Sequence, residues 1–169
     1  MKNNWLRNFL HVGRRGGCLC RDGEIALYPR EFYGFSRQIQ CRQTLILNIV
    51  DEATDRIAGE VALRIGESPE LFYLGHIGYH VDPPFRGHGY AAKACRLCVP
   101  ILREQGMRTV VITTDPGNVP SIRTCLRLGS ELESTVSVPS GLQERLEISA
   151  EKHRFIWTLP EATDAETKL

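Results

Sequence analysis

The chain has 169 residues, of which 42% are hydrophobic and 24% charged, and its formal net charge is +1 at pH 7. This length and composition predict a single globular domain with a proper core. The near-neutral charge provides no bulk field for nucleic acid or an anionic membrane, and no apolar run approaches the roughly 20 residues of a membrane span. Because no signal-peptide pattern opens the sequence, we expect a cytoplasmic protein.

The first 40 residues carry the weakest pattern and are expected to form an irregular N-terminal part of the domain. Residues 4–10 are compatible with a short helix, and residues 13–23, rich in glycine and cysteine, predict a loop. Residues 24–28 predict a strand that Pro29 ends, because proline donates no hydrogen bond to a sheet.

A clearer pattern begins with two β-rich runs, residues 45–51 and 57–65. The polar turn between them predicts an antiparallel hairpin. Residues 67–71 predict a proline-containing loop, and residues 74–81 predict the third clear strand.

A long helix is predicted over residues 87–105. Pro100 removes one of its backbone hydrogen bonds, so we expect a bend near residues 96–100, and Gly106 is a suitable end. Residues 108–114 alternate little and predict a buried strand of the parallel type.

A second helix is predicted to begin at Asn118, which is a suitable N-cap, and to end at Gly129. Pro120 fits its first turn. Two more strands and a frayed tail follow, at residues 134–138, 154–159 and 160–169.

The turn that opens the first helix has the chemistry of a pyrophosphate site. Its glycines allow the backbone to approach an oxyanion closely, and the start of the helix points unpaired N–H groups at it. The guanidinium of Arg86 adds a cation that binds phosphate through two hydrogen bonds. A plain tight connection is the alternative. The candidate cofactor-binding residues of this turn are Arg86, Gly87, His88, Gly89, Tyr90 and Ala91.

The spacing of this turn fits neither a P-loop nor a dinucleotide-binding fingerprint. It resembles the acetyl-CoA loop of the GNAT N-acetyltransferase superfamily, Arg/Gln-x-x-Gly-x-Gly/Ala, with Arg86, Gly89 and Ala91 in the fixed places. A second motif of that superfamily, an Asn followed by Ser three residues later and Gly eleven residues later, is matched by Asn118, Ser121 and Gly129. Both motifs lie at strand-to-helix junctions and in the family's order.

The resemblance covers residues 44–159 and implies a mixed α/β GNAT fold. Its central sheet is mostly antiparallel, flanked by helices and splayed between the fourth and fifth strands. The cosubstrate is acetyl-CoA, whose pantetheine arm would pair with the backbone of Tyr79, His80 and Val81, close to Asn118 and Ser121. The strand sequence Gly-His-Ile-Gly-Tyr resembles that of a branch of predicted acetyltransferases related to the ribosomal-protein N-acetyltransferases.

The sequence departs from the family in two places. Residues 1–40 are too short and irregular to supply the two helices that help to form the acceptor wall. Many members carry a Tyr acid seven residues after the Asn, where this chain has Cys125, which we expect to pack in the core. Ser121 is the better candidate near the leaving thiolate, with local backbone bonding as its alternative role.

His76 is the candidate catalytic base, because a histidine titrates near neutrality and lies on the strand that forms one wall of the splay. His80 lies on the same face of this strand as His76, because side chains alternate along a strand. Glu60 on the neighbouring strand is the next candidate base. A structural, hydrogen-bonded role is the alternative for His76. His88 is expected to face solvent or phosphate.

Two cysteine pairs invite comparison with metal sites. Cys18 and Cys20 lack the usual Cys-x2-Cys spacing, and Cys95 and Cys98 fall on one face of the first predicted helix. We therefore expect packing rather than a bound metal, and no structural disulfides.

The resemblance predicts an acetyl-CoA-dependent N-acetyltransferase that acts by direct attack in a ternary complex. A non-catalytic acyl-CoA-binding or interaction module of the same fold is the alternative, and a longer acyl-CoA is a second one. The implied partners are a small-molecule or protein amine as acceptor and neither nucleic acid nor a membrane. A homodimer is compatible with this reading.

Overall fold

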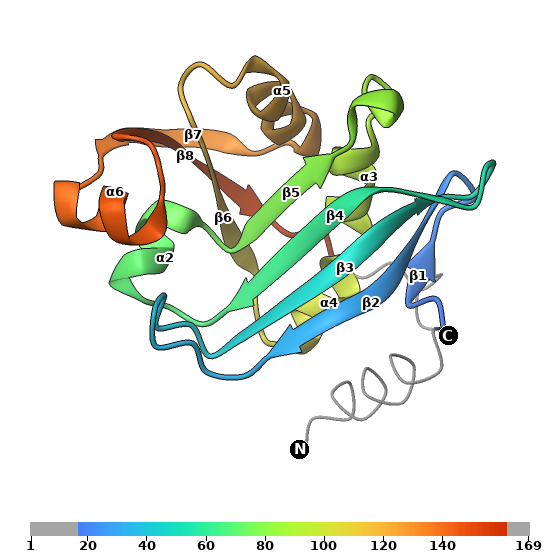
Figure 1. Ribbon diagram of the computed structural model, residues 1–169, viewed down its shortest axis with the longest axis horizontal. Helices are drawn as coiled ribbons and strands as arrows, with labels where there is room; N and C mark the ends of the chain where they lie inside the picture. Colours follow the sequence, from blue (N-terminus) through green and yellow to red (C-terminus); the bar gives the residue numbers. More distant parts are fainter. Residues whose placement is uncertain (1–16, 162–169) are drawn as a thin grey trace.

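The computed structural model describes residues 17–161, which build one eight-stranded sheet flanked by helices (Figure 1). The expected helix at residues 4–10 and residues 162–169 of the expected tail lie outside this part. The strands are β1 (Cys20–Arg21), β2 (Ile25–Tyr33), β3 (Gln43–Asp51), β4 (Arg56–Ile65), β5 (Ile77–Val81), β6 (Thr109–Thr114), β7 (Glu131–Ser137) and β8 (Glu151–Thr158). Their order in the sheet is β1-β2-β3-β4-β5-β6-β8-β7.

Five α-helices and one 3₁₀ turn connect the strands of the described part. They are α2 (Pro69–Leu74), η1 (Pro83–Phe85), α3 (Tyr90–Leu97), α4 (Val99–Glu104), α5 (Val119–Leu128) and α6 (Ser140–Leu146). None of the helices within residues 17–161 has the length and apolarity that a membrane crossing requires.

The core lies between the sheet and the helices α3 and α4. Every second residue of β3 is buried, including Leu45, Leu47 and Ile49, because side chains alternate along a strand. Cys95 and Cys98 are fully buried in the same cluster, so their predicted packing role is confirmed. Burial raises the pKa of both thiols.

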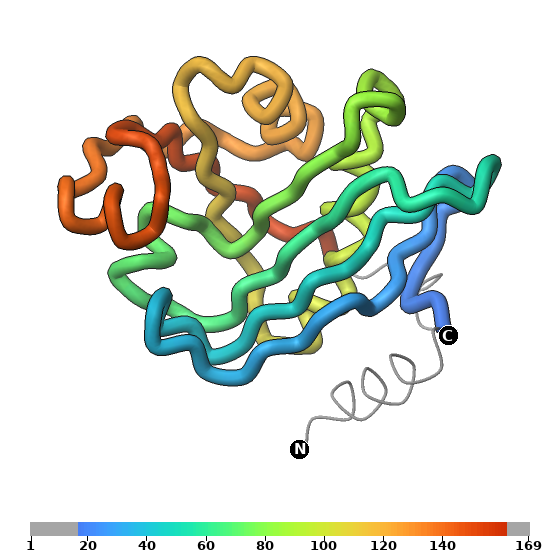
Figure 2. Tube along the Cα trace, viewed as in Figure 1, coloured from blue at the N-terminus to red at the C-terminus, as the bar shows by residue number. Residues whose placement is uncertain are grey.

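The sheet is splayed between β5 and β6. These are the fourth and fifth of the predicted strands, because β1 was not predicted, so the splay lies where it was expected. These strands are the parallel neighbours of the sheet and pair at one register position, Ile77 with Ile112, whereas the other neighbouring strands are antiparallel. Beyond that pair the two strands diverge, with α5 at the open end (Figure 2). The mostly antiparallel, splayed sheet expected from the sequence is therefore confirmed.

Several local predictions hold. β3 and β4 form the expected antiparallel hairpin. Asn118 caps α5 by accepting a hydrogen bond from the Ser121 backbone N–H, at 3.2 Å, and Gly129 ends that helix in a left-handed conformation. The predicted long helix breaks at Cys98 into α3 and α4, inside the region where Pro100 was expected to bend it.

Two predictions near prolines are wrong. β2 does not end at Pro29 but continues to Tyr33, because a register shift after Pro29 accommodates the missing N–H group at a sheet edge. The expected loop at residues 67–71 is instead the start of α2. Ser68 caps this helix by accepting a hydrogen bond from the Leu71 N–H, and Pro69 fits the first turn.

One strand boundary and two short elements differ from the sequence prediction. Because α2 extends to Leu74, the third clear strand begins at Ile77 rather than at residue 74. The loop expected at residues 13–23 contains the short strand β1, and α6 between β7 and β8 was not predicted.

Candidate functional site

Two cavities lie at the open end of the splay. The larger, about 650 Å³, lies between the end of β5, the loop that follows it and α5. The smaller, about 190 Å³, lies between β5 and β6. Both are lined by Tyr79, Asn118 and Ser121, so the two cavities meet at these three residues.

Every predicted cofactor-binding residue except His88 lines the larger cavity. From β5 and the loop these are Tyr79, His80, Val81, Arg86, Gly87, Gly89, Tyr90 and Ala91, and from α5 they are Asn118 and Ser121. His88 is exposed, with its ring 5.5 Å from that of Tyr90. The two sequence motifs, 30 residues apart, therefore form opposite walls of one cavity.

The loop before α3 has a conformation that glycine favours. Gly89 has φ +75° and is the N-cap of α3, so the helix begins directly at the cavity. Tyr90 anchors this start, because its hydroxyl donates a hydrogen bond of 2.5 Å to a carboxylate oxygen of Asp51 at the end of β3. The same bond is the main cause that raises the pKa of Tyr90 to about 12.

Three arginines supply positive charge to the larger cavity. Arg86 donates from Nε to the Val81 carbonyl at 2.9 Å, and Arg123 and Arg127 line the opposite wall from α5. Within residues 17–161, none of the three guanidinium groups forms an ion pair with a carboxylate. Sequence reasoning missed Arg123 and Arg127, although their i, i+4 spacing on a predicted helix places them on one face.

The side chains of β5 and α5 meet where the two cavities join. The Tyr79 hydroxyl lies 2.9 Å from Ser121 Oγ and 3.8 Å from Cys125 Sγ. Cys125 is fully buried, and this burial raises the pKa of its thiol to about 11. The packing role expected for Cys125 is confirmed, whereas the contact of the Tyr79 side chain was not predicted.

The smaller cavity is lined mainly by polar groups. Lys152 on β8 forms an ion pair of 2.5 Å with Asp115, which also accepts a hydrogen bond from Ser149. Thr114 is 4% exposed, and its hydroxyl has no hydrogen-bond partner among the described residues. This cavity therefore has a polar lining, in which the charges of Asp115 and Lys152 are paired with each other.

His76 lies at the closed end of the splay and lines neither cavity. Its Nδ1 accepts a hydrogen bond from the Val111 backbone N–H at 3.0 Å. Nε2 must then carry the proton of the neutral ring, and it lies 3.2 Å from the Gly66 carbonyl and 3.2 Å from a carboxylate oxygen of Glu67. No ring lone pair is left to accept a substrate proton, so this bonding favours a structural role over the predicted role as base.

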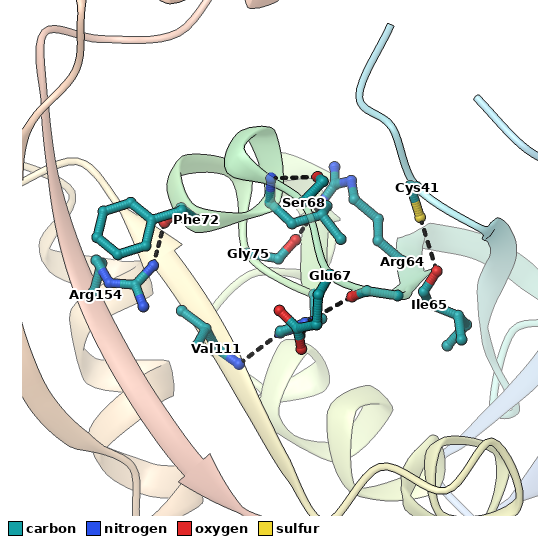
Figure 3. A network of polar contacts seen from close by, with 12 residues as sticks. Cys41, Arg64, Ile65, Glu67, Ser68, Phe72, Gly75, Val111 and Arg154 are labelled. Atoms are coloured by element: carbon teal, nitrogen blue, oxygen red, sulfur yellow. Dashed lines mark hydrogen bonds and ion pairs between the residues drawn. The ribbon is translucent and has the colours of Figure 1, made fainter. Parts of the chain in front are cut away.

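Figure 3 shows the polar network at the closed end, with Val111 and Glu67 labelled. Arg64 reinforces it by donating to the carbonyls of Leu74 and Gly75, at 3.4 and 3.3 Å. These bonds join β4, the end of α2 and β6 where the sheet is still closed.

The other two candidate bases are engaged as well. Glu60 forms an ion pair of 2.5 Å with Arg30 and lines neither cavity. His80 lies opposite Glu60 in the β4–β5 ladder, and its Nε2 is 3.3 Å from a carboxylate oxygen of Asp82. His80 lines the larger cavity and not the smaller one.

Residues 24–131 match the sequence model of the Acetyltransferase (GNAT) domain family. This chain belongs to the GNAT acetyltransferase family. The match spans β2 to α5 and includes both motifs, so the family predicted from the sequence is confirmed.

Solved structures agree on the fold of this GNAT protein. The microcin C7 self-immunity acetyltransferase, in complex with acetyl-CoA and AMP, is 24% identical with a TM-score of 0.53, covering 68% of this chain and 61% of its own. The ribosomal-protein-S5-alanine acetyltransferase of Vibrio fischeri is 18% identical with a TM-score of 0.54, covering 71% and 64%. RimJ of Mycobacterium smegmatis, in complex with CoA-disulfide, is 18% identical with a TM-score of 0.53, covering 70% and 56%.

The matched part thus spans less than two thirds of the length of each of these three proteins. The predicted relation to ribosomal-protein acetyltransferases is confirmed at the level of fold. A search of curated proteins gives no significant match.

We predict that His76→Leu destabilises this GNAT domain, because it leaves the Val111 N–H buried without its acceptor. An unsatisfied buried donor costs about 1–3 kcal/mol, and urea unfolding at pH 7 measures the loss. His76→Asn is the matched control, since an amide oxygen replaces the Nδ1 acceptor and the loss should be smaller. A stable His76→Asn variant with turnover reduced by about 10²-fold or more would instead support the role as base.

Proposed function

We propose that this GNAT protein transfers an acetyl group from acetyl-CoA to a primary amine by direct attack in a ternary complex. The observation that carries the proposal is the meeting of the two cavities at Tyr79, Asn118 and Ser121. The larger cavity combines a helix N-terminus with unpaired arginines, which suits the phosphates of CoA. The smaller one is polar and suits an amine.

In this arrangement the acetyl thioester lies at the junction of the cavities. The neutral amine attacks the carbonyl carbon from the smaller cavity, a tetrahedral intermediate forms, and the carbon–sulfur bond then breaks to release the CoA thiolate. Ser121 lies at the junction and is the group proposed to contact the sulfur. Because no histidine of the described residues lines the smaller cavity, we assign the amine's proton to solvent rather than to His76.

The acceptor is proposed to be a protein amine or a small-molecule amine. Two of the structural neighbours are described as acting on ribosomal protein or conferring self-immunity to microcin, so both classes belong in a test. The cytoplasmic location, the single-domain organisation over residues 1–169 and a homodimer remain predictions.

A non-catalytic acyl-CoA-binding module is the second candidate. The observation that favours it is Cys125, a buried thiol where many GNAT enzymes carry a tyrosine. An assay of thiol release decides between the two candidates. The protein is mixed with acetyl-CoA and a panel of polyamines, amino acids and ribosomal-protein N-terminal peptides, with longer acyl-CoA thioesters in parallel. A module would bind CoA, as calorimetry would show, and release no thiol with any amine.

Direct attack also predicts that Cys125 is never acetylated. A raised pKa, to about 11, keeps its sulfur as the poorly nucleophilic thiol at neutral pH. Intact-protein mass spectrometry after incubation with acetyl-CoA alone should show unmodified protein, and initial-rate plots should intersect. A stoichiometric acetyl group on Cys125, lost in Cys125→Ser, would contradict the ternary-complex mechanism.

A further inference from the structure

We propose that Tyr79 is a positioning residue, which holds the Ser121 hydroxyl so that it donates a hydrogen bond to the sulfur of CoA. This inference rests on the proposed function and extends it to the departure of the thiolate. Sequence reasoning gave Tyr79 a backbone role toward the pantetheine arm, and the structure adds a distinct contact of its side chain.

The geometry places the Tyr79 hydroxyl across the junction of the cavities. Tyr79 belongs to β5, yet its hydroxyl lies at 2.9 Å from Ser121 Oγ and at 3.3 Å from the Ser121 carbonyl, both on α5. The Tyr79 phenol therefore joins two walls of the larger cavity, β5 and α5.

The hydrogen atoms of this cluster can be accounted for. Tyr79 is the hydrogen-bond partner that Ser121 Oγ has within the described residues. Tyr79 has one hydroxyl proton and two acceptors on Ser121, the carbonyl and Oγ. When that proton goes to Oγ, the shorter contact, the Ser121 proton is free to point into the cavity. The Cys125 thiol, 3.8 Å from the phenol oxygen, can donate to Tyr79 in turn.

Both Tyr79 and Cys125 keep their protons at neutral pH. Burial is the main cause that raises the pKa of Tyr79 well above its usual value, so the phenol stays protonated at neutral pH. It therefore keeps a proton with which to donate a hydrogen bond, but it does not transfer that proton readily. Cys125, with its pKa raised to about 11, also keeps its proton.

The arrangement accounts for the missing family tyrosine. Many GNAT enzymes carry an acidic hydroxyl at the α5 position that Cys125 occupies here. In this chain a tyrosine hydroxyl reaches the side of that same residue from β5, on the opposite wall. Tyr79 and Ser121 together take the place of the tyrosine that many GNAT enzymes carry at the position of Cys125.

The chemical step balances without proton transfer from Tyr79. When the carbon–sulfur bond breaks, its electron pair stays on the sulfur, and the acetyl group remains on the amine nitrogen. Ser121 stabilises the thiolate by a charge-assisted hydrogen bond, and Tyr79 strengthens that bond by donating to Ser121. The thiolate takes a proton from solvent on release.

The test measures the thiolate of bound CoA, so it does not require the acceptor. CoA carrying ¹³C at the carbon bonded to sulfur is bound to the full chain, and the thiol is titrated by NMR. We expect the pKa of the bound thiol to lie below that of free CoA. In Tyr79→Phe the thiolate fraction at a fixed pH below that pKa should fall about 10-fold, the effect of one hydrogen bond. Ser121→Ala should lower it at least as much.

A double-mutant cycle separates positioning from a general structural role. Tyr79→Phe should have no further effect in the Ser121→Ala background, but it should keep its effect in Ser121→Thr, which retains the hydroxyl. Tyr73→Phe is the matched control, because Tyr73 lies on α2 and lines neither cavity. Calorimetry checks that the CoA affinity of each variant stays within about threefold of that of the unchanged protein, a difference below 1 kcal/mol.

The outcomes distinguish the inference from the function on which it rests. A thiolate equally stable in the unchanged protein and in Tyr79→Phe, or additive effects of Tyr79→Phe and Ser121→Ala, would overturn the inference alone. Failure of the unchanged protein to bind CoA would contradict the proposed function and the inference together.

Discussion

Replacement of Gly89 by valine is expected to weaken CoA binding by about 100-fold. Gly89 has φ +75°, a conformation that β-branched residues strongly disfavour, so the loop must change its path. The added side chain would also lie at the Arg127 guanidinium, which is 2.7 Å from the position of a Cβ at Gly89. Loss of one hydrogen bond to a charged phosphate oxygen, worth about 1.5–3 kcal/mol, accounts for the factor, because 100-fold corresponds to about 2.7 kcal/mol.

Gly106→Val is the matched control for this prediction. Gly106 follows α4, has φ +81°, and lines neither cavity, so it imposes similar backbone strain away from the site. Isothermal titration calorimetry with CoA and a thermal melt of each variant separate the two effects. Comparable melting temperatures with unchanged CoA affinity in Gly89→Val would show that the phosphates bind elsewhere.

The turn before α3 and the start of α5 could be predicted from the sequence because their determinants are local. A glycine-spaced turn, a helix start and an N-capping Asn118 need only neighbours in the chain to form, and each lies where its pattern indicates. Their pairing across the larger cavity was implied by the family motif rather than by either segment alone. The structural predictions that succeeded here are thus those that depend only on residues close together in the sequence.

The candidate catalytic residues show where such reasoning ends. Alternation along a strand places His76 on the same face as His80, but it does not reveal that β6 approaches closely enough for the Val111 N–H to occupy Nδ1. Tyr79 is the converse case, because its partner Ser121 is 42 residues away and on another element. Both sets of hydrogen bonds join segments that are distant in the sequence, and no local pattern indicates them.

The prolines illustrate the same limit in the fold. Whether Pro29 ends a strand depends on whether its missing N–H faces a partner, and the register shift in β2 removes that conflict. At Pro69 the deciding residue is the preceding Ser68, whose hydroxyl turns the expected loop into a helix. A proline alone therefore indicates an interruption, and its neighbours decide which element follows.

Replacement of Gly59 by alanine is expected to have the largest effect on stability, a loss of about 4 kcal/mol. Gly59 has φ +154° at the irregular register between β3 and β4, and a Cβ there would lie 2.1 Å from the His80 carbonyl oxygen and 2.9 Å from the Val81 Cα. Backbone strain of about 1–3 kcal/mol and overpacking of about 1–3 kcal/mol add, because both contacts are to backbone that cannot rotate away.

The same substitution should also disturb the cofactor side, since His80 and Val81 line the larger cavity at the end of β5. Urea unfolding measures the stability, and calorimetry with CoA measures the affinity of the folded fraction. Gly34→Ala is the control: its added Cβ meets no atom within 4 Å and its φ is ordinary, so its free energy of unfolding should stay within about 0.5 kcal/mol of the unchanged protein. If Gly59→Ala proved as stable as Gly34→Ala, β5 would not approach β4 as closely as this register requires, and the position of the β5 wall of the larger cavity would have to be revised.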